Sequence, residues 1–226
     1  RRSSDLYEDL TVMENILLYA DLYDMSRGSK LDARIDELLD FCRMSPFKKR
    51  LAGRLSGGMK QKLGLTCALI HTPKLLLLDE PTNGVDPVSR REFWKILHEM
   101  LKTGLTIFVS TTYLDEAERC NKIAFINKGR ISSIDTPRNL KNSLGGLLWR
   151  IEVSDKFGAL AILKGLPGVT AAMVMGPAIH VLTGTGVTDE SVRTVLSNGL
   201  GGRGIELLSF APASPSLEDV FIERMS

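Results

Sequence analysis

The sequence predicts an α/β protein, in which helices flank a mainly parallel sheet and a small α+β domain follows. An apolar run at residues 74–79 ends in two adjacent carboxylates, Asp79 and Glu80. A second apolar run at residues 106–110 comes after a segment of helical length, so strands and helices alternate, as in parallel sheets. The pattern changes after the glycine pair at residues 145–146, where shorter segments follow one another.

Three helices are expected before the first strand. Apolar residues recur at near-helical spacing over residues 11–24 and 30–44. Thr11 and Glu14 form the pattern of a capping box at the start of the first of these helices. The third helix is expected to open at Ser56 and its two glycines and to run through residue 70.

The segments after the first strand continue the alternation. We expect helices at residues 88–102 and 113–120, a strand at 106–110, and a hairpin formed by residues 123–127 and 130–134.

Residues 145–226 have a different order of elements. Strands are expected at residues 148–153, 170–175, 178–182 and 205–210, and helices at 155–165 and 189–198. The order βαββαβ predicts a ferredoxin-like domain, and Ser216 is expected to begin a final helix. This domain contains no pattern of catalytic residues, so a structural or regulatory role is the interpretation we favour.

The composition is that of an ordinary globular protein. The 226 residues are 43% hydrophobic and 25% charged, and 29 basic against 27 acidic residues give a net charge of +2. This balance argues against a nucleic-acid partner. The three cysteines are far apart and suggest a reduced, cytoplasmic setting. No apolar run approaches 18 residues, so we expect no direct membrane insertion.

The sequence LSGGM at residues 55–59 indicates an anion-binding helix start. Ser56 is a good N-cap, and Gly57 and Gly58 allow a ligand to approach the backbone closely. The unpaired N–H groups and the dipole at such a helix start favour a phosphate. An ordinary capped helix with a flexible glycine pair is the alternative interpretation.

The acidic pair after the first strand indicates a metal and water site. A carboxylate at the position of Asp79 is suited to holding Mg²⁺, directly or through water. Glu80 is suited to polarising an attacking water in phosphoryl transfer, which depends mainly on positioning and charge neutralisation. A plain surface turn after the strand is the alternative.

Taken together, LSGGM at 55–59, LLLLDE at 75–80 and NGVD at 83–86 resemble the signature, Walker B and D-loop motifs of the ATP-binding subunits of ABC transporters. The resemblance covers roughly residues 5–140 and implies an ABC ATPase domain at 1–144, with a helical subdomain at about 8–72 and the Walker B and switch region at 73–144. It implies the following roles: Ser56, Gly57, Gly58 and Met59 contact the ATP of a partner subunit, Asp79 binds Mg²⁺, Glu80 is the general base, and Asp86 bridges the two subunits. The alternative interpretation of Asp86 is an N-cap for the helix at residue 88, which is compatible with that role.

One family residue is replaced. The family has a switch histidine where this chain has Thr112, between Thr111 and Tyr113. Threonine donates one hydrogen bond, is shorter than histidine and carries no positive charge. The resemblance therefore implies a weakened contact to the γ-phosphate at Thr112, whereas the general base at Glu80 is intact.

A second family motif is missing. The sequence contains no Gly-x-x-x-x-Gly-Lys-Ser/Thr, which would cradle the β- and γ-phosphates. We interpret the chain as the C-terminal part of a larger subunit, an incomplete P-loop NTPase domain that begins near the Q-loop at Arg1 and Arg2. A divergent protein that never had a P-loop is the alternative.

The resemblance implies an ATP-hydrolysing subunit of an ABC-2 or multidrug exporter that uses ATP and Mg²⁺. Its expected partners are a transmembrane permease and a second ATPase domain, either in a homodimer or in tandem, and its expected location is the cytoplasmic face of the plasma (inner) membrane. The alternative is a weakly hydrolysing module that completes or regulates a partner's ATP site, which the threonine at position 112 supports. A DNA-repair or chromosome-associated ATPase lacks support, because the chain shows no long coiled coil or basic patch.

Overall fold

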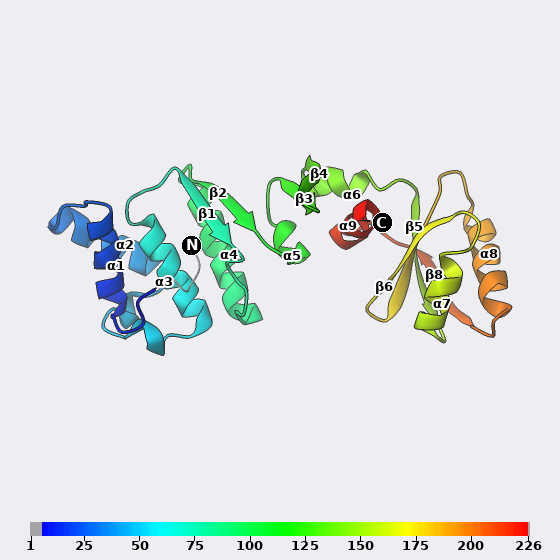
Figure 1. The fold of residues 1–226 in the computed structure, drawn as a ribbon, viewed down its shortest axis with the longest axis horizontal. Coiled ribbons are helices and arrows are strands. Elements are labelled where there is room, and N and C mark those ends of the chain that lie inside the picture. Colours follow the sequence, from blue (N-terminus) through cyan, green and yellow to red (C-terminus); the bar gives the residue numbers. More distant parts are fainter. Residues whose placement is uncertain (1–5, 226) are drawn as a thin grey trace. The chain divides into compact units, whose positions relative to one another are not determined.

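The computed structural model describes residues 6–225, which form two compact units that divide between Thr112 and Tyr113 (Figure 1). Arg1 and Arg2, expected near the Q-loop, lie outside the described residues. None of the helices within residues 6–225 has both the length and the hydropathy to cross a membrane. The first unit contains α1 (Val12–Leu22), α2 (Ser29–Phe41), α3 (Gly57–Leu69), β1 (Leu75–Asp79), α4 (Pro87–Leu101) and β2 (Thr106–Ser110), with two short 3₁₀ helices at Ser45–Phe47 and Ala52–Arg54.

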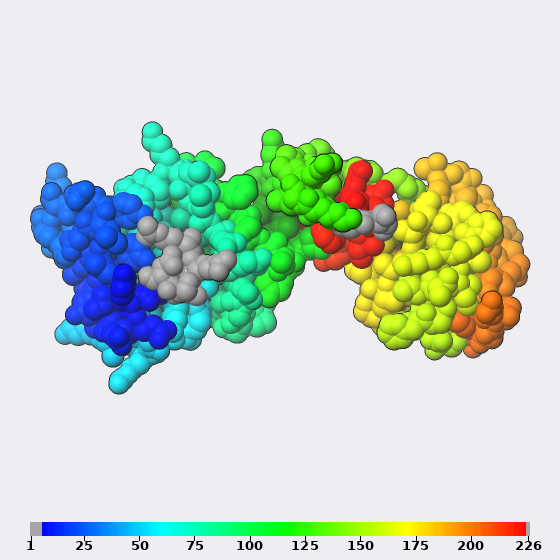
Figure 2. Space-filling view, in the orientation of Figure 1, coloured from blue at the N-terminus to red at the C-terminus, as the bar shows by residue number. Residues whose placement is uncertain are grey.

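The first helices of this unit form where the sequence predicts them. α1 begins with a capping box, in which Thr11 Oγ1 accepts a hydrogen bond from the Glu14 amide and the Glu14 carboxylate accepts one from the Thr11 amide. α1 and α2 both contact α3, and the blue and cyan atoms of this unit adjoin one another on the surface (Figure 2). α2 ends three residues earlier than expected, and Arg43 follows it in the left-handed conformation with φ 56°.

The strands β1 and β2 form a two-stranded parallel sheet, in register from Leu75 opposite Thr106 to Asp79 opposite Ser110. Within the described residues, β1 is buried on one face only, although its apolar run suggests a fully buried strand. Its even-numbered leucines are buried, whereas Leu75 and Leu77 are 51% and 58% exposed. Successive side chains of a strand point to opposite faces, so this alternation means that β1 is covered on one face and open on the other.

The second unit begins with a short helix and a hairpin and continues into a larger sheet. It contains α5 (Leu114–Ala117), β3 (Ile123–Asn127), β4 (Arg130–Asp135), α6 (Pro137–Asn142), β5 (Leu147–Val153), α7 (Lys156–Leu163), β6 (Val169–Met175), β7 (Ala178–Thr183), α8 (Asp189–Gly201), β8 (Leu207–Pro212) and α9 (Leu217–Met225). The hairpin β3–β4 has a bulge after Phe125.

The strands β5 to β8 form a four-stranded sheet in the order β6-β7-β5-β8, and every neighbouring pair is antiparallel. The element order over residues 147–212 is βαββαβ, as expected from the sequence. The helices α7 and α8 pack on this sheet around a core that includes Ile151, Leu163 and Leu196 (Figure 1). Trp149 belongs to the same core and stacks on Phe210 at a ring-centroid distance of 4.8 Å.

A second core of this unit joins the hairpin, α6, α9 and the sheet. Phe125 of β3 packs edge to face with Phe221 of α9, with ring centroids 5.5 Å apart. Ser216 caps α9 with its Oγ, which accepts a hydrogen bond from the Asp219 amide at 3.2 Å, and this agrees with the helix start expected there. The fully buried Asp219 also bonds His180 Nδ1 of β7 at 2.8 Å. These contacts fix α9 to the sheet and to the hairpin at once.

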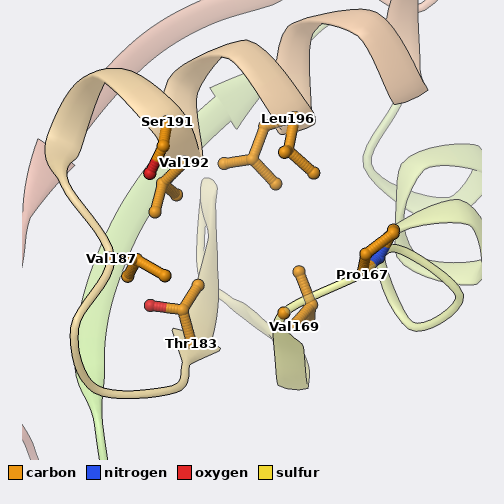
Figure 3. Close-up of a pocket in the computed structure, with 9 residues that line it drawn as sticks. Pro167, Val169, Thr183, Val187, Ser191, Val192 and Leu196 are labelled. Atoms are coloured by element: carbon orange, nitrogen blue, oxygen red, sulfur yellow. The ribbon is translucent and has the colours of Figure 1, made fainter.

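A shallow cavity of about 40 Å³ lies beside α8 (Figure 3). Its wall is mostly valine, leucine and proline side chains, and Thr183 and Ser191 are its two hydroxyl-bearing residues. The Thr183 hydroxyl accepts a hydrogen bond from Trp149 Nε1 at 2.9 Å, and Ser191 Oγ donates to the Thr188 carbonyl at 2.8 Å. Both hydroxyls therefore serve the fold.

Fewer of the described strands pair in parallel than the sequence predicts. Only β1 and β2 pair in parallel, whereas the hairpin and the four-stranded sheet are antiparallel. The alternation of strands and helices predicted a mainly parallel sheet, but alternation alone does not show which strands pair.

Candidate functional site

The start of α3 is formed by the predicted Ser56-Gly57-Gly58 segment. Ser56 has extended backbone angles and its Oγ accepts a hydrogen bond from the Met59 amide at 3.4 Å. Ser56 and Gly57 are exposed, and Gly58 is buried. The exposed helix start presents backbone N–H groups to solvent, which is the arrangement that favours an anion.

The two glycines of this segment lie against the start of α4. A Cβ at Gly58 would come within 2.5 Å of the Ser89 Cβ, and a Cβ at Gly57 would lie 3.6 Å from the Gly84 carbonyl oxygen. A real Cβ does not come as close to another atom as 2.5 Å, so α3 and α4 approach this closely only because residue 58 is glycine. The signature segment and the D-loop are therefore in contact within the chain.

Asp86 is the N-cap of α4. Its Oδ1 accepts hydrogen bonds from the Val88 and Ser89 amides, each at 3.0 Å. The Ser89 side chain and then the Ser89 amide hold the pKa of the Asp86 carboxyl below its usual value. The carboxylate is exposed and charged at neutral pH, and the capping role is compatible with the bridging role that the resemblance implies.

Asp79 is the last residue of β1, and a residue of the neighbouring strand β2 donates a hydrogen bond to its side chain. The Ser110 hydroxyl donates a hydrogen bond to Asp79 Oδ1 at 2.6 Å, and the two residues are register partners. Asp79 is exposed at this end of the strand. A carboxylate that is oriented by a fixed donor and open to solvent is suited to a metal ion.

Glu80 follows with an unusual backbone. Its φ is 45°, in the left-handed region that few residues other than glycine adopt. Its amide donates to the Ser110 carbonyl at 2.9 Å, which fixes the turn at the end of the sheet. Glu80 Oε2 accepts hydrogen bonds from the Thr112 amide at 3.3 Å and from the Thr112 hydroxyl at 3.5 Å. The structure thus brings Glu80 and Thr112 together.

The predicted residues fall into two groups within the first unit. Ser56, Gly57, Gly58 and Met59 lie at the start of α3, beside the α4 start that Asp86 caps. Asp79, Glu80 and Thr112 lie at the ends of β1 and β2. The loop from Pro81 to Val85 connects the groups, and its Gly84 is the residue that faces Gly57.

Comparison with known proteins identifies the family. Residues 2–83 match the ABC transporter family profile. The chain is 31% identical to the daunorubicin resistance ATP-binding protein DrrA2 of Streptomyces coeruleorubidus, covering 95% of this chain and 67% of that protein. It is 34% identical to the Nod factor export ATP-binding protein I of Rhizobium sp. strain N33, covering 96% of this chain and 68% of that protein. The chain belongs to the ABC transporter ATP-binding proteins.

Another ABC relative is longer. The probable multidrug ABC transporter ATP-binding protein YbhF of Escherichia coli is 40% identical over 223 residues, which are 97% of this chain and 37% of YbhF. The chain therefore spans a little over a third of the length of this relative.

Solved ABC structures resemble the fold. One, described as the ATP-binding subunit of an ABC transporter, is 31% identical with a TM-score of 0.52 and covers 61% of this chain and 57% of that chain. Another is CbiO1 of Clostridium perfringens, which is 26% identical with a TM-score of 0.57 and covers 63% of this chain and 58% of that chain. The mixed α/β fold of ABC ATPases is therefore shown for this chain.

ABC ATPase domains bind ATP, typically with Mg²⁺, and the site residues fit the ion in part. The described residues contain no group of three or more His, Cys, Asp or Glu side chains that could hold a metal ion by itself. Magnesium sites of nucleotide-binding proteins use one or two carboxylates and complete the shell with phosphates and water. Asp79, an exposed hard oxygen donor held by Ser110, fits this limited role.

Two residues of the site were missed by the sequence interpretation. Ser110 was placed only as the last residue of a strand, and Ser89 only inside a helix. Asp86 followed by Pro87 is a recognisable helix start, and it places the Ser89 amide within reach of the Asp86 carboxylate. The pairing of Ser110 with Asp79 depends on the strand register, which neither segment specifies alone.

Proposed function

We propose that this chain is the part of an ABC-2 or multidrug-type exporter ATPase that contains the signature motif, the Walker B carboxylates and the switch region. The observation that supports this most is the arrangement at the ends of β1 and β2. There, the two neighbouring carboxylates have separate donors: Ser110 bonds Asp79, and Thr112 bonds Glu80. Separate donors keep the carboxylates in different orientations, as separate metal and water roles require.

In this proposal, Asp79 is the carboxylate that holds Mg²⁺, the ion that neutralises charge on the phosphates. Glu80 orients the attacking water and accepts its proton, while the Thr112 amide and hydroxyl restrain its carboxylate. Because phosphoryl transfer depends on positioning and on neutralising charge, fixed donors to both acids support it.

The start of α3 supplies the second part of the proposed site. Ser56, Gly57, Gly58 and Met59 would contact the ATP held by the P-loop of a second ATPase domain. The exposure of Ser56 and Gly57 supports this, since a ligand from another subunit can reach them. Asp86, which caps the adjacent α4, would bridge the two subunits beside the nucleotide.

The proposed partners are therefore a second ATPase domain, in a homodimer or in tandem, and a transmembrane permease that ATP-driven docking of the two domains would move. This places the protein on the cytoplasmic face of the plasma (inner) membrane. We further propose that residues 1–144 are the ABC ATPase portion and that residues 145–226 are a ferredoxin-like accessory domain. The antiparallel sheet order β6-β7-β5-β8 supports the accessory-domain assignment.

A weakly hydrolysing nucleotide-binding module is the second candidate function. The observation that favours it is Thr112 at the switch position. Its hydroxyl contacts Glu80 at 3.5 Å, the outer limit of a hydrogen bond, and it provides no positive charge for the γ-phosphate. Such a module would complete or regulate a partner's ATP site while its own site turned over slowly.

The test is steady-state phosphate release by a protein in which the P-loop segment of a relative precedes this sequence. We expect Mg-ATP hydrolysis that Glu80→Gln and Asp79→Asn each abolish, whereas Glu206→Gln, in the second unit, leaves it unchanged. Hydrolysis that survives Glu80→Gln would contradict the exporter ATPase assignment. ATP binding without hydrolysis in the parent protein would favour the module.

A further inference from the structure

A polar cavity lies between α2, α3 and α4, away from the proposed ATP-contacting residues. We call it the Glu92 pocket. Its cations are Arg43, Lys62 and Lys95, and its central carboxylate is Glu92. It has a volume of about 140 Å³ and is open to solvent, so it is smaller than the pockets that enclose drug-sized ligands.

The cations of the Glu92 pocket converge on one carboxylate. Lys62 Nζ lies 2.6 Å from Glu92 Oε2, and Arg43 lies 3.9 Å from Glu92 Oε1. Lys62, then Arg43 and Lys95, lower the pKa of the Glu92 carboxyl, which is therefore ionised at neutral pH. Three positive charges against one negative charge leave a net positive pocket.

The other acid that lines the cavity does not cancel this excess. Both carboxylate oxygens of Glu99 lie 2.8 Å from Lys102 Nζ, and Lys102 is outside the cavity lining. Glu99 and Lys102 thus neutralise each other. Because Glu92 pairs most closely with Lys62, whose side chain is 11% exposed, the unbalanced positive charge of the pocket is that of Arg43 and Lys95.

Arg43 is held at the rim in a conformation that its residue type does not prefer. It follows the C-cap of α2 with φ 56°, a position where glycine is the usual residue. Its side chain is 78% exposed and its guanidinium lies 3.9 Å from Glu92 Oε1, so it retains donors for another oxygen anion. A strained residue with an available charged group at the rim of a cavity is typical of a binding site.

The remaining wall is apolar. Phe41, at the end of α2, is partly exposed, and Ile96 of α4 is buried beneath the cavity floor. An apolar wall beside a cationic rim suits a ligand that has both an anionic group and an apolar body.

We propose that the Glu92 pocket binds a small organic anion. A carboxylate or phosphate group would lie between Arg43 and Lys95, and an apolar or aromatic body would pack on Phe41 and Ile96. Arg43 would make the paired hydrogen bonds that a planar guanidinium makes with such groups.

A ligand in the Glu92 pocket would act on the proposed ATP site through α3 and α4. The helices that line the pocket, α3 and α4, begin at the signature segment and at Asp86, and they touch there through Gly58 and Ser89. An occupant would restrain the two helices relative to each other. This regulatory consequence rests on the proposed function, whereas the binding itself does not.

The test is an NMR titration of the ¹⁵N-labelled 226-residue chain without nucleotide. The probes are phenyl phosphate and benzoate, with benzyl alcohol as the neutral control and inorganic phosphate as the control without an apolar body. We expect saturable shifts at the end of α2 and in α3 and α4, with at least one organic anion binding about tenfold more tightly than benzyl alcohol. If benzyl alcohol bound as tightly as the organic anions, the pocket would not select an anion. If inorganic phosphate bound as tightly as phenyl phosphate, the proposed apolar contacts with Phe41 and Ile96 would be wrong.

A pair of glycine substitutions separates binding from folding. Arg43→Gly removes both the guanidinium and the backbone strain, so we expect a higher melting temperature and about tenfold weaker binding of the organic anion. Asp24→Gly is the matched control, because Asp24 follows α1 with φ 52° and lies outside the pocket. It should raise the melting temperature and leave the affinity unchanged. Unchanged affinity in both Arg43→Gly and Lys95→Gln would overturn the proposal.

Discussion

The Glu80 carboxylate accepts a hydrogen bond from the main-chain amide of Thr112 as well as from its hydroxyl, at 3.3 Å and 3.5 Å. A main-chain donor is present whatever the side chain at position 112. Orientation of the proposed base therefore does not depend on the family's histidine, whereas charge toward the γ-phosphate does.

Replacing Thr112 with histidine should speed hydrolysis. In a protein in which a P-loop segment precedes this sequence, Thr112→His should raise kcat about tenfold, equivalent to about 1.4 kcal/mol. An imidazole reaches farther toward the γ-phosphate and can share charge. KM should change less, because ground-state ATP binding rests mainly on the P-loop. Phosphate release is measured with the partner site silenced. An unchanged or lower kcat would mean that Thr112 is not the weak element.

Glu80→Gln should trap nucleotide in the same protein. The amide retains the size of the side chain and its contact with the Thr112 amide but cannot accept a proton from water. Hydrolysis should fall while Mg-ATP stays bound, and the closed dimer should accumulate. Size-exclusion chromatography with light scattering and retained labelled ATP provide the measurement. Unchanged turnover would show that Glu80 is not the base.

The 226-residue chain alone should bind Mg-ATP poorly. Its sequence contains no Gly-x-x-x-x-Gly-Lys-Ser/Thr, the motif that supplies most phosphate contacts in P-loop ATPases. Isothermal titration calorimetry with Mg-ATP is the direct measurement. Micromolar affinity would refute this expectation and would point to another nucleotide site in the chain.

Gly58→Ala should destabilise the first unit. The added methyl group would lie 2.5 Å from the Ser89 Cβ, so α3 and α4 must separate, at a cost of about 1–3 kcal/mol. Combining Gly58→Ala with Ser89→Gly should recover part of the lost stability, because Ser89→Gly removes the Cβ that the added methyl group would contact. Chemical denaturation of the two single variants and the double variant measures the coupling. Strictly additive effects would mean that the two residues do not touch.

The stability contributed by ionised Asp86 should depend on pH in the acid range. Its folded-state pKa is lowered, chiefly by the Ser89 side chain, so its charge stabilises the fold above the unfolded-state pKa of about 3.9. This contribution is lost as pH falls through the folded-state value. Asp86→Asn keeps a good N-cap without the charge. The melting-temperature difference between wild type and variant should therefore shrink from about pH 7 to about pH 3, and a constant difference would refute the assignment.

Local signals predicted much of the fold. The Thr11–Glu14 capping box, the Ser56 cap and the βαββαβ order all depend on residues near one another in sequence, and each was found. The exposure of Leu75 and Leu77 could not be read from an apolar run, because burial depends on what packs on each face.

For the candidate site, the sequence predicted where the acidic residues lie but not what orients them. Motif spacing pointed to Asp79 and Glu80, which do lie at the end of β1. The donors that orient them were not predictable, because Ser110 reaches Asp79 through strand pairing across 31 positions of sequence. Chain segments this far apart meet according to register, and register follows from the whole packed unit.

The left-handed backbone at Glu80 has a consequence for laboratory evolution. Glycine adopts a φ of 45° with less strain than glutamate does. Glu80 therefore lowers the stability of the fold, although the proposed chemistry needs its carboxylate. Selection for heat resistance alone would thus favour loss of the acid at this position, and selection for turnover would restore it. Libraries screened for expression or melting temperature should therefore hold position 80 fixed, or they will enrich robust proteins without hydrolytic activity.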